Sequence, residues 1–471
     1  MVYEDLADWA IKYAQKLGAT YAEARLEETK GQDFVLKNGT LEGSSFSSTS
    51  GLGIRLAVNG SMGFISTNIM NKEKVEETVR HAIKLASASA RMADKLILSD
   101  EKTQKKNYQI KEKIKLGDVN PEKKIGLLTE IEKQILATKV KVPGRFLHIN
   151  DWKTHKYIVN TAGSKISSTL PYLNFFYLLT VLNNKQTAQR MWQYGSAGGW
   201  ELTGKWKLPE LLASEVKTLN IALEKGTSPP KGSVDLVVSP QVTGIIAHES
   251  CGHPYEADRI MGREAAQAGE SFITTDMIGK AIAKPVVTLV DDPTRPETYG
   301  FYLYDDECVK ARKKFLVKDG IITEFLQNRE TASFFGTKSN GASRASEYDK
   351  EPLVRMSNTF FLEGDYSEEE LIKEVKLGVF MKSFMEWNID DKRYNNRYVG
   401  SECYLIENGE IKTPVKNPVI ELTTPTLYGA IDALANNTEF HAASCGKGEP
   451  MQGIPVTHGG PSIRIRGVKL G

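Results

Sequence analysis

The chain has 471 residues, of which 40% are hydrophobic and 25% are charged, and its formal net charge is +2. These values are typical of a globular protein of roughly two or three domains. They give no electrostatic support for binding to nucleic acid or to an anionic membrane. Four cysteines are too few for a disulfide framework. The acidic N-terminus does not resemble a signal peptide, and no apolar run of about 18 residues is present, so we expect a cytoplasmic protein.

The first half of the chain combines helical periodicity with strand-like runs. Residues 4–17 and 72–92 predict amphipathic helices. A third helix, 121–138, should begin after Asn120, because asparagine is a good N-cap and proline suits the first turn. The apolar residues near 170–182 predict a buried strand. Strands are expected at 21–27, 33–37, 52–58, 62–66, 145–152, 155–161, 165–168 and 171–182.

A segment rich in proline and glycine, 226–232, is the best candidate for a domain boundary. We therefore expect an α+β protein with an N-terminal α/β sandwich-like domain, residues 1–228, and a β-rich C-terminal domain, residues 229–471. In the C-terminal domain, strands are expected at 234–238, 286–291, 308–317, 321–327, 358–363, 399–407 and 462–468, and helices at 367–376 and 426–436.

The most informative motif is His248-Glu249-Ser250-Cys251-Gly252-His253, on a helix of the C-terminal domain. Imidazoles are preferred zinc ligands, and a glutamate beside the first can act as general base toward zinc-bound water. The histidines are five residues apart, and in a regular α-helix this spacing turns them about 140° apart. A π-type bulge would bring them together, and Gly252 would relieve strain there. The motif predicts a metal site only on a distorted helix, and a chance match is the alternative.

A hydrolytic zinc site needs three protein ligands and one open position. Cys445 is the best third candidate, because it lies in a Gly-containing segment that predicts a flexible loop, where Lys447 would favour the thiolate. The weaker candidates are Cys251, Cys308 and Cys403, which suit a core or a turn, and His441 and His458, which bracket Cys445.

Five ordered blocks of the sequence resemble the TldD/PmbA (TldD/TldE) family, zinc metalloproteases that are also proposed modulators of DNA gyrase. The resemblance covers nearly the whole chain, and HExxxH with a distant cysteine matches the TldD branch. One departure is Cys308, where a glycine is expected. The blocks are 248–253 with 255–258, 290–294 with 304–307, 355–359, 404–409 with 414–415, and 445–447 with 452–456 and 460–461.

The resemblance implies one zinc ion per chain, held by His248, His253 and Cys445, with Glu249 as general base. It implies a metalloprotease that hydrolyses peptide bonds in unfolded or extended polypeptides and takes part in peptide maturation. It also implies a heterodimer in which a metal-free TldE/PmbA-type paralogue encloses the active site, with a homodimer as the alternative. We expect the N-terminal domain, residues 1–228, to contribute to substrate enclosure and to dimer contacts.

A zinc-containing non-catalytic subunit, or a binding protein acting with the paralogue, is the alternative to an enzyme. An extended peptide could add to an exposed strand edge of the β-rich domain. The residue that stabilises the oxyanion stays open among Tyr255, Arg259, Arg355, His441 and His458.

Overall fold

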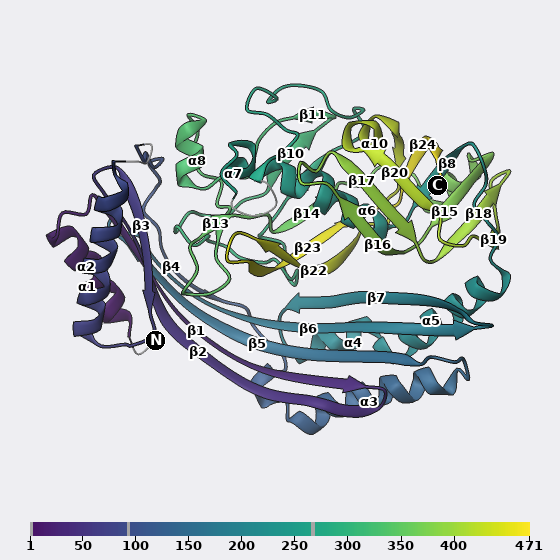
Figure 1. Ribbon diagram of the computed structural model, residues 1–471, viewed down its shortest axis with the longest axis horizontal. Coiled ribbons are helices and arrows are strands. Elements are labelled where there is room, and N and C mark those ends of the chain that lie inside the picture. The colour runs from purple at the N-terminus through teal and green to yellow at the C-terminus, as the bar shows by residue number, and fades with distance from the viewer. Residues whose placement is uncertain (1–2, 92–94, 265–268) are drawn as a thin grey trace.

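The computed structural model describes residues 3–91, 95–264 and 269–471, and the first half of the chain forms one long, curved sheet (Figure 1). Its strands follow the order β3-β2-β1-β5-β6, and the outer edge of β6 pairs first with β4 and then with β7. Among the described strands of this sheet, only β4 and β6 pair in parallel. The strands are β1 (Tyr21–Lys37), β2 (Thr40–Val58), β3 (Ser61–Thr67), β4 (Lys105–Gln109), β5 (Gly144–Asn160), β6 (Lys165–Asn183) and β7 (Gln186–Ala197).

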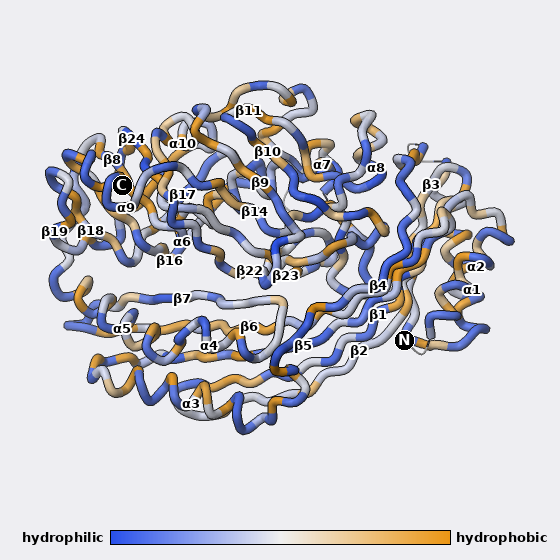
Figure 2. Tube along the Cα trace, turned by 180° about the vertical axis from the view of Figure 1, so that it is seen from behind, coloured by the Kyte–Doolittle hydropathy of each residue, from blue (hydrophilic) through white to orange (hydrophobic). Residues whose placement is uncertain are grey.

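Helices cover one face of this sheet, and the C-terminal half of the chain lies on the other (Figure 1). On β1, Ala22 and Ala24 join the apolar cluster with α1 and α2, whereas Arg25 donates a hydrogen bond to the carbonyl of Glu347 in the C-terminal half. The alternation of hydrophobic and hydrophilic residues along α3 is visible in Figure 2. The helices are α1 (Glu4–Lys16), α2 (Lys72–Ser89), α3 (Pro121–Ala137), α4 (Thr203–Trp206) and α5 (Leu208–Lys225).

Residues 233–471 form two six-stranded sheets and a three-stranded sheet, and helix α6 (Pro240–Ala247) packs between strands of the first two. The first sheet runs β11 (Ile321–Ile322), β10 (Lys314–Lys318), β9 (Leu289–Asp291), β14 (Asn358–Phe361), β23 (Gln452–Gly460), β22 (Glu439–Lys447). The second runs β19 (Glu410–Pro414), β18 (Cys403–Glu407), β15 (Leu377–Met381), β8 (Ser233–Val238), β24 (Ile463–Lys469), β21 (Ile431–Leu434). The third runs β16 (Phe384–Ile389), β17 (Asn395–Gly400), β20 (Val419–Thr423).

Shorter elements complete this half of the chain. They are the two-stranded pair β12 (Ser343–Arg344) and β13 (Leu353–Val354), with helices α7 (Ala257–Ile260), α8 (Arg329–Phe334), α9 (Glu368–Lys373) and α10 (Thr424–Ala430).

The expected α+β class is confirmed, and so is the N-cap of α3, where the Asn120 side chain accepts a hydrogen bond from the Lys123 amide. The prediction of a helix over residues 426–436 is partly wrong: the helix ends at Ala430, and the next four residues form strand β21 because they pair with β24. Strand 399–407 is two strands, β17 and β18, which belong to different sheets. The division at residue 228 stays a prediction. Among the helices of the described ranges, none has the length and apolar character needed to cross a membrane.

Cys308, where the family resemblance leads us to expect glycine, has a φ of +63°. This left-handed conformation favours glycine, because a Cβ meets the backbone there. The thiol is buried and lies 3.8 Å from the carbonyl oxygen of Ile158, on β5. The departure from the family pattern therefore leaves a strained turn against the N-terminal sheet and lies outside the metal motif.

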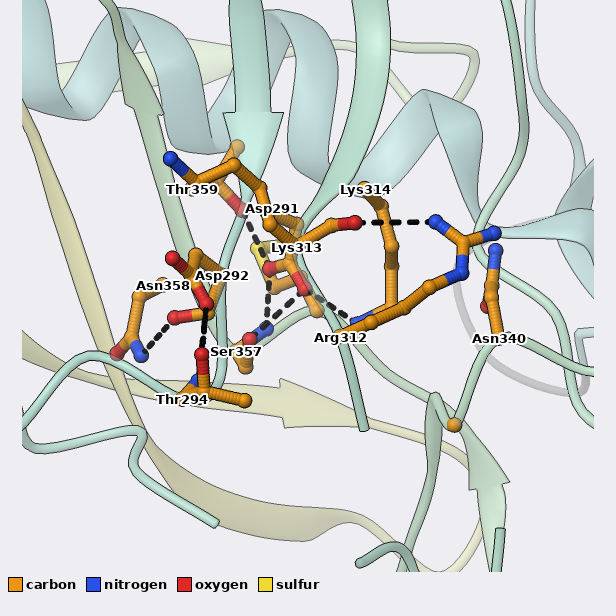
Figure 3. Close-up of polar contacts among 12 residues, drawn as sticks. Asp291, Asp292, Thr294, Arg312, Lys313, Lys314, Asn340, Ser357, Asn358 and Thr359 are labelled. Atoms are coloured by element: carbon orange, nitrogen blue, oxygen red, sulfur yellow. Dashed lines mark hydrogen bonds and ion pairs between the residues drawn. The ribbon is translucent and has the colours of Figure 1, made fainter. Parts of the chain in front are cut away.

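A buried ion pair joins β9 and β10 (Figure 3). Lys314 Nζ lies 2.9 Å from Asp291 Oδ1, and both side chains are fully buried. The same carboxylate accepts hydrogen bonds from the amide and hydroxyl of Ser357 and from the Thr359 hydroxyl on β14. The Asp291 carboxylate thus accepts four hydrogen bonds, one of them from the opposite charge of Lys314, and these offset the cost of burying the two charges. The cluster fixes β14, which packs against the segment of the metal motif.

Candidate metal centre

The HExxxH segment departs from α-helical geometry at the first histidine. Helix α6 continues into a π-helical turn, His248–Gly252, which accommodates the extra residue. As a result the rings of His248 and His253 lie with their centroids 4.9 Å apart. The predicted π-type bulge is confirmed. Gly252 has an ordinary helical φ of −51°, but a Cβ there would lie 2.5 Å from the sulfur of Met356, so the glycine permits close packing rather than an unusual backbone.

Cys445 reaches the same point from β22. Its Sγ lies 3.5 Å from His253 Nε2, and one ligand atom each of His248, His253 and Cys445 lies within 4.8 Å of the others. The expected flexible loop is wrong here, because Cys445 pairs with Ile454 of β23 and is buried. All three side chains are buried, and His248 Nδ1 has no hydrogen-bond partner among the residues that the structure describes. Two imidazoles and a thiol are a donor set that suits zinc.

A buried carboxylate supports the second histidine. His253 Nδ1 lies 3.2 Å from Glu256 Oε2, which also accepts from Lys447 Nζ at 3.1 Å and from Arg259 Nε at 3.4 Å. Burial would raise the pKa of Glu256, but Lys447 and His253 outweigh it and hold that pKa well below its usual value. A carboxylate on one ring nitrogen orients the other toward a metal. Lys447 therefore acts on Glu256, and not on the thiol as the sequence led us to expect.

The Cys445 thiol is set up to ionise. Burial would raise its pKa, but His253 and Arg355 outweigh burial and hold the pKa well below the usual range. Arg355 also donates a hydrogen bond to the Cys445 carbonyl. The thiolate is the form that binds a metal. Cys251, Cys308 and Cys403 are buried and lie outside the cluster.

Glu249 faces the same cavity, which has a volume of about 520 Å³. Its Oε1 accepts a hydrogen bond from Trp387 Nε1 at 3.1 Å, and its Oε2 from Arg393 Nη1 at 3.2 Å. Burial would raise the pKa of Glu249, but His248, His253 and Arg393 outweigh it, so the pKa lies below its usual value. The carboxylate is therefore ionised. Sequence reasoning missed Trp387 and Arg393, because neither belongs to a motif.

Of the five residues considered for stabilising the oxyanion, the structure places one at the cavity. His458 lines the cavity, and its ring centroid lies 6.1 Å from that of His248. The ring of His441 packs against that of His458, with the centroids 5.9 Å apart, and burial lowers the pKa of His441 to about 3. Three candidates lie away from the cavity: Tyr255 is fully buried, Arg259 pairs with Glu256 and Glu264, and Arg355 holds the backbone of β22 and β23.

Two histidines and a glutamate on one helical segment, completed by a third donor and opening on a cavity, are typical of metal-dependent hydrolases. Three family models match the chain: PmbA/TldA metallopeptidase domain 1 over residues 22–86, the central domain over 114–224, and the C-terminal domain over 231–471. The chain belongs to the PmbA/TldD metallopeptidase family.

Individual relatives agree over almost the full length. A metalloprotease of Methanocaldococcus jannaschii is 29% identical over 451 residues, covering 94% of this chain and 95% of that protein. The zinc metalloprotease TldD homolog of Saccharolobus solfataricus is 25% identical over 470 residues, covering 98% of each. Among solved structures, TldE from Thermococcus kodakarensis has a TM-score of 0.73 at 18% identity, covering 99% of this chain and 100% of that one. A proposed modulator of DNA gyrase from Bacteroides thetaiotaomicron has a TM-score of 0.78 at 19% identity, covering 99% and 98%.

Proposed function

We propose that this chain is a zinc-dependent peptidase that hydrolyses peptide bonds in unfolded or extended polypeptides. His248, His253 and Cys445 would hold one zinc ion, and Glu249 would be the general base. The observation that carries the proposal is the convergence of these three donors, within 4.8 Å, beside an ionised carboxylate on a shared cavity. A structural zinc site would instead use four protein donors and would not need Glu249.

Zinc, when bound, supplies Lewis-acid polarisation of the peptide carbonyl and makes water a better nucleophile. Glu249 takes the proton from the attacking water and delivers it to the leaving amine. Glu256 holds His253 with its Nε2 toward the cluster. His458 is the best-placed donor for the oxyanion, because it is the one of the five candidates that lines the cavity.

A free strand edge at the cavity supports the proposed preference for extended polypeptides. Strand β16 pairs with β17 on one side, and no described strand pairs with its other side. The Asp390 amide donates to the Asn395 carbonyl, and hydrogen-bonded pairs alternate along an antiparallel ladder. The backbone groups of Trp387 and Ile389, which line the cavity, therefore face away from β17. An extended peptide can pair with them, and a folded chain cannot.

The shared fold with TldE supports a further part of the proposal, that the chain works together with a metal-free paralogue of that type. Such a partner would leave the metal centre in this chain and change only its access to substrate. The peptidase assay is therefore run with and without a paralogue.

Glu249→Gln tests the proposal, because it removes the base and keeps the size of the side chain. We expect zinc content to stay at that of wild type and cleavage of an unfolded polypeptide to fall by about 100-fold or more. Glu130→Gln, at a partly exposed position on α3, is the matched control and should cleave normally. Full cleavage by zinc-loaded Glu249→Gln would exclude Glu249 as the base. A wild type that holds zinc and cleaves nothing, even with the paralogue, would favour the non-catalytic alternative.

A further inference from the structure

One hairpin holds both carboxylate oxygens of Glu249. We call residues 384–400, which comprise β16, its connecting loop and β17, the clamp hairpin. Trp387 on β16 binds Oε1 through its indole N–H, and Arg393 in the loop binds Oε2 through its guanidinium. The side chains of Glu249 and Arg393 are each about nine-tenths buried, at 9% exposure. The orientation of the carboxylate is therefore set by this hairpin as well as by the π-helical turn that carries Glu249.

A second set of contacts ties the clamp hairpin back to that turn. Ser250, next to Glu249, donates from its hydroxyl to Asn396 Oδ1 at 3.2 Å. The Asn396 amide donates to the Thr424 hydroxyl at 2.8 Å, and this hydroxyl donates to the carbonyl of Arg393, also at 2.8 Å. Arg393 has a φ of +62°, an uncommon conformation for arginine that these contacts hold in place. The chain of contacts thus closes on itself, and it fixes the guanidinium relative to Glu249.

We propose that the clamp hairpin positions the general base, so that Trp387 and Arg393 are positioning residues for peptide hydrolysis. This inference rests on the proposed function. A carboxylate beside two histidines could swing toward the metal and become a further ligand. Two donors from a separate hairpin prevent this and keep a lone pair directed at the cavity.

Trp387 also gives the clamp a direct connection to the substrate. Its backbone amide and carbonyl face the open edge of β16, where an extended peptide would pair, while its indole N–H holds Glu249. Substrate that pairs with β16 therefore stiffens the residue that holds the base. Docking of an extended chain and alignment of the base are coupled through one side chain.

The test uses the zinc-loaded full-length chain, with the paralogue added if wild type requires it, and a fluorogenic extended peptide. The variants are Arg393→Gln, Arg393→Lys and Trp387→Phe, which keeps the ring and removes the N–H. The matched control is Arg397→Gln, which changes a partly exposed arginine of the same hairpin that pairs with Glu386 and Glu421. Zinc content is measured for each protein, and kcat is separated from KM.

We expect Arg393→Gln to lower kcat by roughly 10- to 100-fold, as misplacement of a catalytic group does, with KM within about threefold and zinc content unchanged. Arg393→Lys should recover part of that loss, because it restores a charged donor. Trp387→Phe should lower kcat less, and Arg397→Gln should match wild type. Unchanged kcat in Arg393→Gln and in Trp387→Phe, or a change confined to KM, would overturn the proposal.

A double-mutant cycle gives a readout that does not need activity. The urea midpoints of Glu249→Gln and Arg393→Gln should combine non-additively, whereas those of Glu249→Gln and Arg397→Gln should add. Additivity in the first pair would show that the ion pair does not hold Glu249, and it would refute the proposed role of Arg393 as a positioning residue. An inactive wild type overturns the proposed function and the catalytic role of the clamp together, whereas an active wild type with unaffected clamp variants overturns the clamp alone.

Discussion

Replacing Gly244 with alanine tests whether His458 is held where the structure places it, against the helix that leads to the metal motif. A Cβ at Gly244 would lie 2.3 Å from His458 Nδ1 and 3.2 Å from its Cε1. The ring cannot simply move away, because its centroid lies 6.1 Å from those of Trp192 and His248 and 5.9 Å from that of His441. An alanine here therefore forces a rearrangement beside the proposed zinc ligand His248.

The expected magnitude combines two opposing effects. Replacing glycine with alanine inside a helix raises the free energy of unfolding by about 0.5–1 kcal/mol, whereas overpacking a buried site lowers it by about 1–3 kcal/mol. We expect Gly244→Ala to lower the free energy of unfolding by about 1–2 kcal/mol. Gly126→Ala on α3 is the matched control, because its Cβ would meet nothing within 4 Å, and this variant should be more stable by about 0.5–1 kcal/mol.

Urea unfolding of the metal-free proteins measures this difference, and competition with a chelator measures the accompanying loss of zinc affinity. Gly244→Ala should lose zinc at a lower chelator concentration than Gly126→Ala, because the displaced imidazole presses on His248. Equal stabilisation by the two alanines would refute the placement of His458.

Three further variants test other parts of the structure. Cys445→Ala should lose zinc to a chelator more readily than wild type, whereas Cys403→Ala, in another sheet, should not; equal retention would place the third ligand elsewhere. Asp291→Ala should lower the free energy of unfolding by about 3–5 kcal/mol, because it leaves Lys314 charged in the core, and a loss below about 1 kcal/mol would contradict the buried pair. Burial lowers the pKa of His441 to about 3 in the folded chain, whereas the same side chain has a pKa near 6.5 in the unfolded chain. As the pH falls, the unfolded chain is therefore the first to bind a proton at His441. This contribution to stability is present above pH 6.5 and falls with pH, by about 2 kcal/mol at pH 5. His441→Gln should show a correspondingly smaller loss between pH 7 and pH 5, and an identical loss would refute the burial of a neutral ring.

Much of the fold depends on local signals that the sequence carries. Periodic apolar residues predicted α1 and α2, and Asn120 marked the start of α3. The long strands were predicted in pieces: residues 21–27 and 33–37 are both part of β1. The polar residues between them resemble a turn, but they lie in a continuous strand because neighbouring strands pair along its whole length. Strand β7 was missed, because its sequence, QTAQRMWQYGSA, is largely polar and shows no regular apolar alternation.

The candidate site was likewise predicted from the sequence only where local signals define it. The HExxxH spacing alone required a distorted helix, and the π-helical turn has that distortion. Cys445 was selected as a loop residue, since Gly446 and Gly448 suggest flexibility, yet pairing with β23 makes it part of a strand. Trp387 and Arg393 are 138 and 144 residues from Glu249, so only tertiary structure brings them to the base.

The separation in sequence between the proposed zinc ligands also affects the order in which the metal centre forms during folding. Cys445 contacts His253 across 192 residues, and it lies on β22, which is synthesised well after the segment that carries the two histidines. Contacts of this length form late in folding, because the intervening loop must be closed first. The emerging polypeptide thus carries the histidines and the glutamate well before it can complete the centre. On the proposed function, peptidase activity would therefore begin only after β22 has paired with β23 and brought Cys445 to the histidines.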